Sequence, residues 1–78
     1  MELLYEKSYT NTKGEKFNIR ILNDRNEKII AAVNEYSESN NLNPVMNYSN
    51  LEFPYGVDIE EIMTQAKAVA NNVKSLPS

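Results

Sequence analysis

Residues 2–22, ELLYEKSYTNTKGEKFNIRIL, alternate between hydrophobic and polar side chains in two segments that a polar turn separates. Successive side chains of a strand point to opposite faces, so this alternation is typical of strands with one buried face. In the first segment, residues 2–9, three hydrophobic side chains would lie on one face: Leu3, Tyr5 and Tyr9. The second, residues 16–22, does the same with Phe17, Ile19 and Ile21. The intervening residues 10–14 end in glycine and fit a type I turn closed by a glycine bulge, so we predict a β-hairpin.

The hydrophobic spacing changes after the hairpin. Asp24 is followed three residues later by Glu27, which is the spacing of a capping box at the start of a helix. Hydrophobic residues then recur at helical intervals: Ile29, Ile30, Val33 and Tyr36. Pro44 disfavours helix just before it, so we expect this helix to end near Ser39.

Residues 45–53 carry a weaker pattern, because polar residues interrupt their hydrophobic ones. Leu51 and Phe53 are compatible with a strand that joins the hairpin, and we predict such a strand near residues 50–53. An irregular loop is the alternative. Residues 54–56, Pro-Tyr-Gly, then turn the chain.

A second helix follows this turn. Asp58 and Glu61 have the spacing of a capping box, and Val57 and Ile62 occupy the two positions of a hydrophobic staple. An apolar stripe continues over four turns: Ile59, Ile62, Met63, Ala66, Val69, Ala70 and Val73. We therefore predict one α+β domain over residues 1–78 with the order ββα(β)α. Its two helices would pack on one face of a short, mainly antiparallel sheet, and at least one strand edge would stay unpaired.

The composition argues against catalysis. The chain has 78 residues and contains no cysteine and no histidine, so a thiolate zinc site and an imidazole base are both excluded. Its only glycines, Gly14 and Gly56, form no phosphate-binding loop. A pair of carboxylates would still need a cleft, which a core this small hardly encloses. We expect no enzyme activity and no cofactor. We also expect no signal peptide or membrane span and a cytoplasmic location, which is the host cytoplasm if a phage encodes the protein.

The acidic side chains are concentrated in the middle of the chain. Residues 29–66 contain six acids and no base: Glu35, Glu38, Glu52, Asp58, Glu60 and Glu61. If the two helices lay side by side, these acids would form one anionic patch for a basic partner, or a mimic of a phosphate backbone. The alternative is an ordinary solvated face. The acids near Asp58 also resemble oxygen ligands of a cation, but acids in the first turn of a helix normally stabilise its N-terminus, so we predict no metal.

Three tyrosines fall at or near predicted turns and are candidate interface anchors: Tyr9, Tyr48 and Tyr55. The leading hypothesis is a small protein-binding module, an inhibitor or regulator that docks on a larger protein. A homodimer through a strand edge or the C-terminal helix is the second. A nucleic-acid-binding hairpin is the third, and its basic side chains would be those of Lys7, Lys13, Lys16 and Arg20. In its asparagine content, 12 of 78 residues, and its lack of catalytic groups, the chain resembles small accessory proteins of phages and mobile elements.

Overall fold

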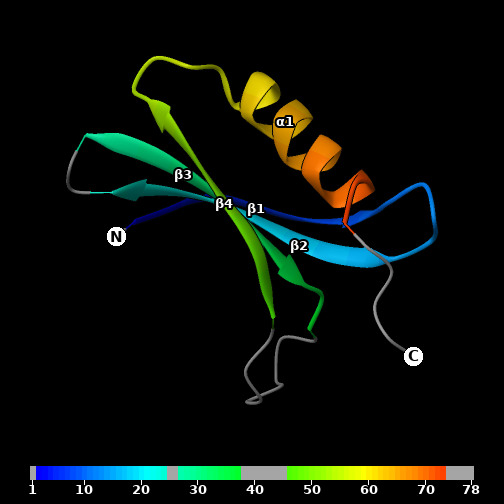
Figure 1. Ribbon diagram of the computed structural model, residues 1–78. Coiled ribbons are helices and arrows are strands. Elements are labelled where there is room, and N and C mark those ends of the chain that lie inside the picture. The colour runs from blue at the N-terminus through cyan, green and yellow to red at the C-terminus, as the bar shows by residue number, and fades with distance from the viewer. Residues whose placement is uncertain (1, 25–26, 38–45, 74–78) are drawn as a thin grey trace.

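The computed structural model describes residues 2–24, 27–37 and 46–73. These residues form four strands and then one helix: β1 (Glu2–Thr10), β2 (Lys16–Asp24), β3 (Lys28–Glu35), β4 (Asn47–Pro54) and α1 (Ile59–Asn71). Each strand pairs antiparallel with its neighbour in sequence, so the sheet order is β1-β2-β3-β4. Figure 1 shows α1 lying across one face of this twisted sheet. The α+β class is confirmed, and both outer edges of the sheet are unpaired in the described part of the chain.

The N-terminal hairpin is confirmed, including its turn. The Asn11 amide donates to the Glu15 carbonyl over 2.8 Å, and the Gly14 amide donates to the Asn11 carbonyl over 3.0 Å. Gly14 has a φ of +83°, a value that is strained for a residue with a side chain, so glycine is favoured at this position.

One detail of the hairpin differs from the prediction. The register shifts between Leu3 and Tyr5, so that Leu3 lies opposite Leu22 whereas Tyr5 lies opposite Ile21. Neighbouring residues of β2 point to opposite faces, and Ile21 points into the core. Leu3 therefore shares the other face with Leu22 and does not share the face of Tyr5 and Tyr9. A bulge of this kind is invisible to a pattern of strict alternation.

The helix predicted from Asp24 to about Ser39 is wrong, because residues 28–35 of that stretch form the strand β3. Asp24 pairs with Lys28 across the β2–β3 connection, and Glu27 has a φ of +61°. A left-handed residue just before the second strand is typical of a three-residue hairpin loop. The two residues of the apparent capping box therefore lie on either side of the connection between two antiparallel strands.

Burial explains why the strand is favoured over the helix. Ala31, Ala32 and Val33 are consecutive, and their exposed fractions are 0%, 6% and 0%. Three consecutive helical residues span about 200° of a helix, which is too wide for one buried stripe. A central strand with a neighbour on each side shields such a run, and its β-branched residues suit that position.

The predicted third strand is confirmed as β4 and is longer than expected. It pairs with β3, placing Leu51 opposite Ala31 and Phe53 opposite Ile29. The interrupting polar residues are tolerated because β4 is an edge strand, so one side of it remains open to water.

The predicted C-terminal helix is confirmed as α1 with Asp58 at its N-cap, but the side chain of Asp58 makes no capping hydrogen bond. Most of the predicted stripe is buried in the structure: Ile62, Met63, Ala66 and Ala70. Val57, Val69 and Val73 pack partly against the same core, whereas Ile59 is 44% exposed. No described helix is long and apolar enough to cross a membrane.

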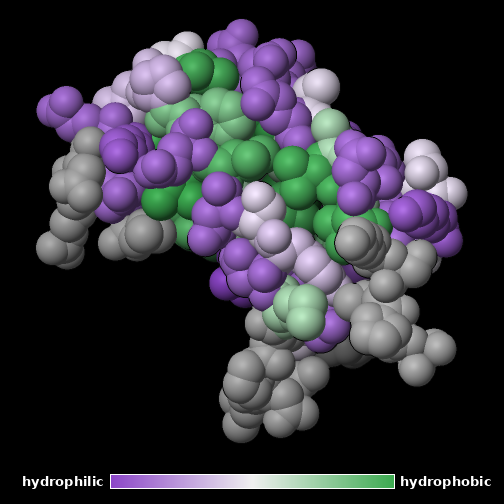
Figure 2. Space-filling view, in the orientation of Figure 1, coloured by the Kyte–Doolittle hydropathy of each residue, from purple (hydrophilic) through white to green (hydrophobic). Residues whose placement is uncertain are grey.

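The core lies between α1 and the face of the sheet that α1 covers. Its largest fully buried side chains come from β2, β3 and α1: Phe17, Ile19, Ile21, Val33 and Ile62. Figure 2 shows hydrophobic residues gathered in the middle of this view, with hydrophilic residues around them. The packing of one helix on a four-stranded sheet thus accounts for the buried face.

The carboxamide of Asn11 joins the first turn to the end of the helix. Asn11 is 5% exposed, and its Nδ2 donates to the Ala70 carbonyl over 2.9 Å. Its Oδ1 accepts the amides of Lys13 and Glu15 over 3.0 and 2.8 Å. The last carbonyls of a helix have no partner within the helix, so the turn supplies one of them.

Replacing Asn11 by Ala should lower the free energy of unfolding by about 2–4 kcal/mol, because the buried Ala70 carbonyl and two partly buried backbone amides lose their partner. Urea unfolding followed by circular dichroism measures this difference. Thr12→Ala is the matched control in the same turn, because Thr12 bonds to the described residues through its backbone amide, which donates to Asn71, and not through its side chain. Equal stability of the two variants would contradict the role given to Asn11.

Candidate functional site

In the described part of the chain, one face of the sheet carries no helix. The strand registers arrange its side chains in rows that cross all four strands. One row is Ser8, Asn18, Asn34 and Asn47; the next is Glu6, Arg20, Ala32 and Asn50; the third is Leu3, Leu22, Ile30 and Glu52. This open face therefore has a polar, amide-rich centre and an apolar row beside it.

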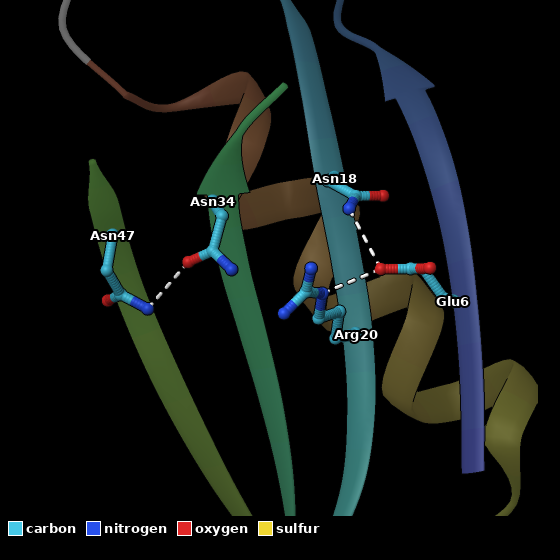
Figure 3. Close-up of polar contacts among 5 residues, drawn as sticks. All are labelled: Glu6, Asn18, Arg20, Asn34 and Asn47. Atoms are coloured by element: carbon cyan, nitrogen blue, oxygen red, sulfur yellow. Dashed lines mark hydrogen bonds and ion pairs between the residues drawn. The ribbon is translucent and has the colours of Figure 1, made fainter. Parts of the chain in front are cut away.

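The polar centre is a network of side chains that satisfy one another (Figure 3). Glu6 Oε2 accepts from Arg20 Nε over 2.6 Å and from Asn18 Nδ2 over 3.0 Å. Across the sheet, Asn47 Nδ2 donates to Asn34 Oδ1 over 2.7 Å. Because Glu6 already pairs with Arg20, the centre of the open face has no free charge to offer a ligand.

The four basic side chains proposed for a nucleic-acid-binding hairpin do not form one surface. Arg20 and Lys16 belong to the open face, where Lys16 Nζ lies 4.1 Å from the centre of the Tyr36 ring. Lys7 lies opposite Ile19 and therefore points to the helix side. Lys13 Nζ donates to the Val73 carbonyl at the end of α1 over 3.2 Å. The hairpin thus divides its positive charge between two faces.

Large exposed hydrophobic side chains gather where β1 begins. Leu3, Leu4 and Tyr5 are 52%, 44% and 39% exposed, and they lie on the unpaired outer strand. Tyr55 is 52% exposed, and its hydroxyl donates to Asn23 Oδ1 over 2.5 Å. Asn23 belongs to β2 and pairs with Glu2, the first residue of β1. The ring of Tyr55 is therefore one strand away from the start of β1. We call Leu3, Leu4, Tyr5 and Tyr55 the β1 corner.

The other two candidate tyrosines are engaged inside the molecule. Tyr9 is half-buried, its oxygen accepts a hydrogen bond from Asn71 Nδ2 over 3.1 Å, and Lys67 Nζ lies 5.6 Å from its ring centre. Tyr48 is also half-buried, and its ring meets that of Phe17 edge to face at 5.4 Å. Of the three, only Tyr55 has a largely exposed ring.

The structure does not gather the six acids into one patch. Glu38 lies outside the described residues, and Glu52 is on the open face, where its Oε1 lies 3.3 Å from Lys28 Nζ. Glu35 ends β3, at the opposite end from Lys28, and seven strand steps correspond to about 23 Å. Three exposed acids remain together at the start of α1: Asp58, Glu60 and Glu61. The single patch required two adjacent helices, and residues 28–35 are a strand instead.

Tyr48 has an unusual environment. Its hydroxyl is buried and has no hydrogen-bond partner, the only such side-chain atom among the residues described. Burial raises the pKa of Tyr48 above its ordinary value, and the negative charges of Glu35 and Glu15 raise this pKa further. Sequence patterns did not reveal this feature, because it depends on which acids approach the ring in three dimensions.

Within residues 2–24, 27–37 and 46–73, no group of three or more acidic side chains is placed to hold a metal ion. Comparison of the chain with protein-family models, with curated proteins and with solved structures found no match. The surfaces themselves, above all the β1 corner, are therefore the basis of a functional proposal.

Replacing Tyr48 by Phe should leave the free energy of unfolding at pH 7 unchanged or raise it by about 1 kcal/mol, because a buried hydroxyl without a partner is removed. The raised pKa means that folding favours the neutral phenol. The contribution of the neutral phenol to stability is fully present below the unfolded-state pKa of 10.0. It is lost as the pH rises through the higher folded-state pKa. Between about pH 9 and pH 11 the parent protein should therefore lose more stability than Tyr48→Phe, as urea unfolding at each pH measures. Parallel losses in the two proteins would contradict the assignment.

Proposed function

We propose that this protein is a small, non-catalytic binding module that docks on a larger protein through the β1 corner. The observation that carries the proposal is the exposure of three large hydrophobic side chains at the start of an unpaired edge strand, with the exposed ring of Tyr55 one strand away. Isolated exposed hydrophobic residues are ordinary on protein surfaces, but a group of them at an open strand edge is typical of an interaction site.

The order of residues in β1 supports docking by strand addition. Leu3, Leu4 and Tyr5 are consecutive, so both faces of this segment are apolar. Such a run is typical of a strand that is covered on both sides, yet in this chain it lies at an edge and is exposed. A partner strand beside β1, together with the partner's adjacent surface, would cover it.

Tyr55 supports the same surface. It follows Pro54 and precedes Gly56, and its hydroxyl is held by Asn23, so binding would cost its ring little conformational entropy. Tyrosines of this kind are frequent anchors in protein interfaces.

The alternative functions have less support from the structure. A homodimer through the apolar stripe of α1 is disfavoured because the stripe already packs on the sheet. A nucleic-acid-binding hairpin is disfavoured because Lys7 and Arg20 point to opposite faces. We propose that the partner is a host or defence protein whose activity the module inhibits or regulates, in keeping with the resemblance to accessory proteins of phages and mobile elements.

Replacing both Leu3 and Leu4 by Lys should weaken binding of the partner at least about tenfold, because strand addition would bury two new charges. The matched control introduces the same two charges on the exposed side of α1 by Gln65→Lys and Ala68→Lys. The measurement is co-purification from the source cell, followed by affinity measurement with the protein that the parent retains. Equal retention by both double variants would contradict docking at the β1 corner.

Light scattering coupled to gel filtration distinguishes docking from self-assembly. The module should elute as a monomer near its chain mass of 8.9 kDa. A dimer that the Leu3 and Leu4 substitutions dissociate would instead support the homodimer through a strand edge.

Tyr55→Ala should weaken binding of the same partner by about 1 kcal/mol or more and leave the fold intact, because the ring is largely outside the core. Tyr55→Phe is the control that removes only the hydroxyl, and it should weaken binding much less. An affinity that Tyr55→Ala leaves unchanged removes this residue from the interface.

A further inference from the structure

We propose that the occupant of the outer edge of β1 is an extended acidic segment of the partner, which adds to the sheet as a fifth strand. This inference rests on the proposed function and names the chemistry of its partner. The apolar β1 corner does not by itself indicate the charge of the partner segment. That charge is inferred from the charged side chains beside the edge of β1.

The free charges along the second half of β1 are positive. Lys7 is exposed on the helix side, and no carboxylate of the described residues lies within 4.0 Å of its ammonium group. Lys67 lies over the ring of Tyr9, two residues farther along the strand, and Lys13 follows in the turn. Lys7 and Lys67 thus place positive charge on the helix side of the outer edge, in a chain whose net charge is −3.

The acid in the same stretch is already neutralised. Glu6 points to the open face, where Arg20 Nε lies 2.6 Å from its Oε2. A segment placed beside β1 therefore meets positive charge without an acidic partner on the helix side. On the open face it meets Glu6, whose negative charge is already paired with Arg20. Acidic side chains on the segment would satisfy the lysines, and basic ones would be repelled.

The helix leaves space for this segment. α1 packs mainly on β3, with further contacts to β2 and β4, and it approaches β1 only near Tyr9. Figure 1 shows α1 diverging from β1 toward the N-terminus. Tyr5 and Lys7 accordingly have no helix above them, and both are exposed.

Two-fold registers of a second copy that are centred on residues 5–7 of β1 bring unfavourable side chains together. When two copies of one edge strand pair antiparallel about a two-fold axis, the residue at the axis faces itself. A register centred on Glu6 or on Lys7 opposes like charges, and one centred on Tyr5 places Leu3 against Lys7. Lysine in an edge strand is a common guard against such self-pairing. An acidic segment of another protein avoids each of these conflicts.

The added strand would run antiparallel to β1 and change in character along its length. Opposite Leu3 to Tyr5 it would carry apolar β-branched residues, and opposite Lys7 and Tyr9 it would carry acids. Main-chain hydrogen bonds to β1 would supply affinity, and the alternating side chains would supply specificity.

Titration of the isotope-labelled full chain with two capped peptides, ETETVVV and KTKTVVV, tests this proposal by NMR. Both peptides share the same apolar residues and differ only in charge. The acidic peptide should shift the backbone amides of residues 3–9 in a saturable way and bind at least about tenfold more tightly than the basic one. Lys7→Glu should abolish or reverse this preference. Lys28→Glu, which makes the same charge change on β3, should preserve it.

Three outcomes would overturn the proposal. Equal binding of the two peptides would show that the lysines do not select the occupant. Absence of peptide-induced shifts at residues 3–9 would exclude strand addition, while docking of the larger protein would still be judged by the Leu3 and Leu4 variant. Shifts of the same amides with protein concentration alone would identify the occupant as a second copy.

Discussion

The carboxamide of Asn11 is the contact on which the arrangement of this molecule depends. It closes the first turn through its oxygen and binds the end of α1 through its nitrogen, which donates to the Ala70 carbonyl. Asn71 reinforces the same junction, since its Oδ1 accepts the Thr12 amide over 3.0 Å. A small chain has few core residues to orient a helix, so a polar junction between turn and helix carries unusual weight.

That junction also determines which surfaces remain free. Because α1 is anchored at the β1–β2 turn and crosses toward β3 and β4, it covers one face of the sheet and leaves the start of β1 exposed. The open face pairs Arg20 with Glu6 and Lys28 with Glu52, whereas the β1 edge combines apolar residues with Lys7, which has no carboxylate beside it among the described residues. The proposed binding surface is thus a consequence of where the helix is attached.

The N-terminal hairpin, the strand β4 and the helix α1 were predictable from local pattern, whereas β3 was misread as a helix. The N-terminal hairpin and α1 each combine a clear period with a turn or cap signal, and both are present. For β3, the spacing of Ile29, Ile30 and Val33 fits a helix as well as a strand, because hydrophobic residues occupy both faces of this particular strand and obscure its alternation. Its neighbours β2 and β4 bury Ala31 and Ala32 together, and that shielding is a tertiary effect.

The sequence by itself determined the α+β class, the N-terminal hairpin, the C-terminal helix and the absence of histidine and cysteine chemistry, because these follow from residue types and from short-range periodicity. The tertiary structure alone decided that residues 28–35 are a strand, that Leu3 changes face at a bulge and that the acids do not form one patch. It also brought Tyr55 to Asn23, beside the start of β1, and left Lys7 without a carboxylate near it in the described part of the chain. Each of these depends on residues distant in sequence coming together, which no local pattern encodes.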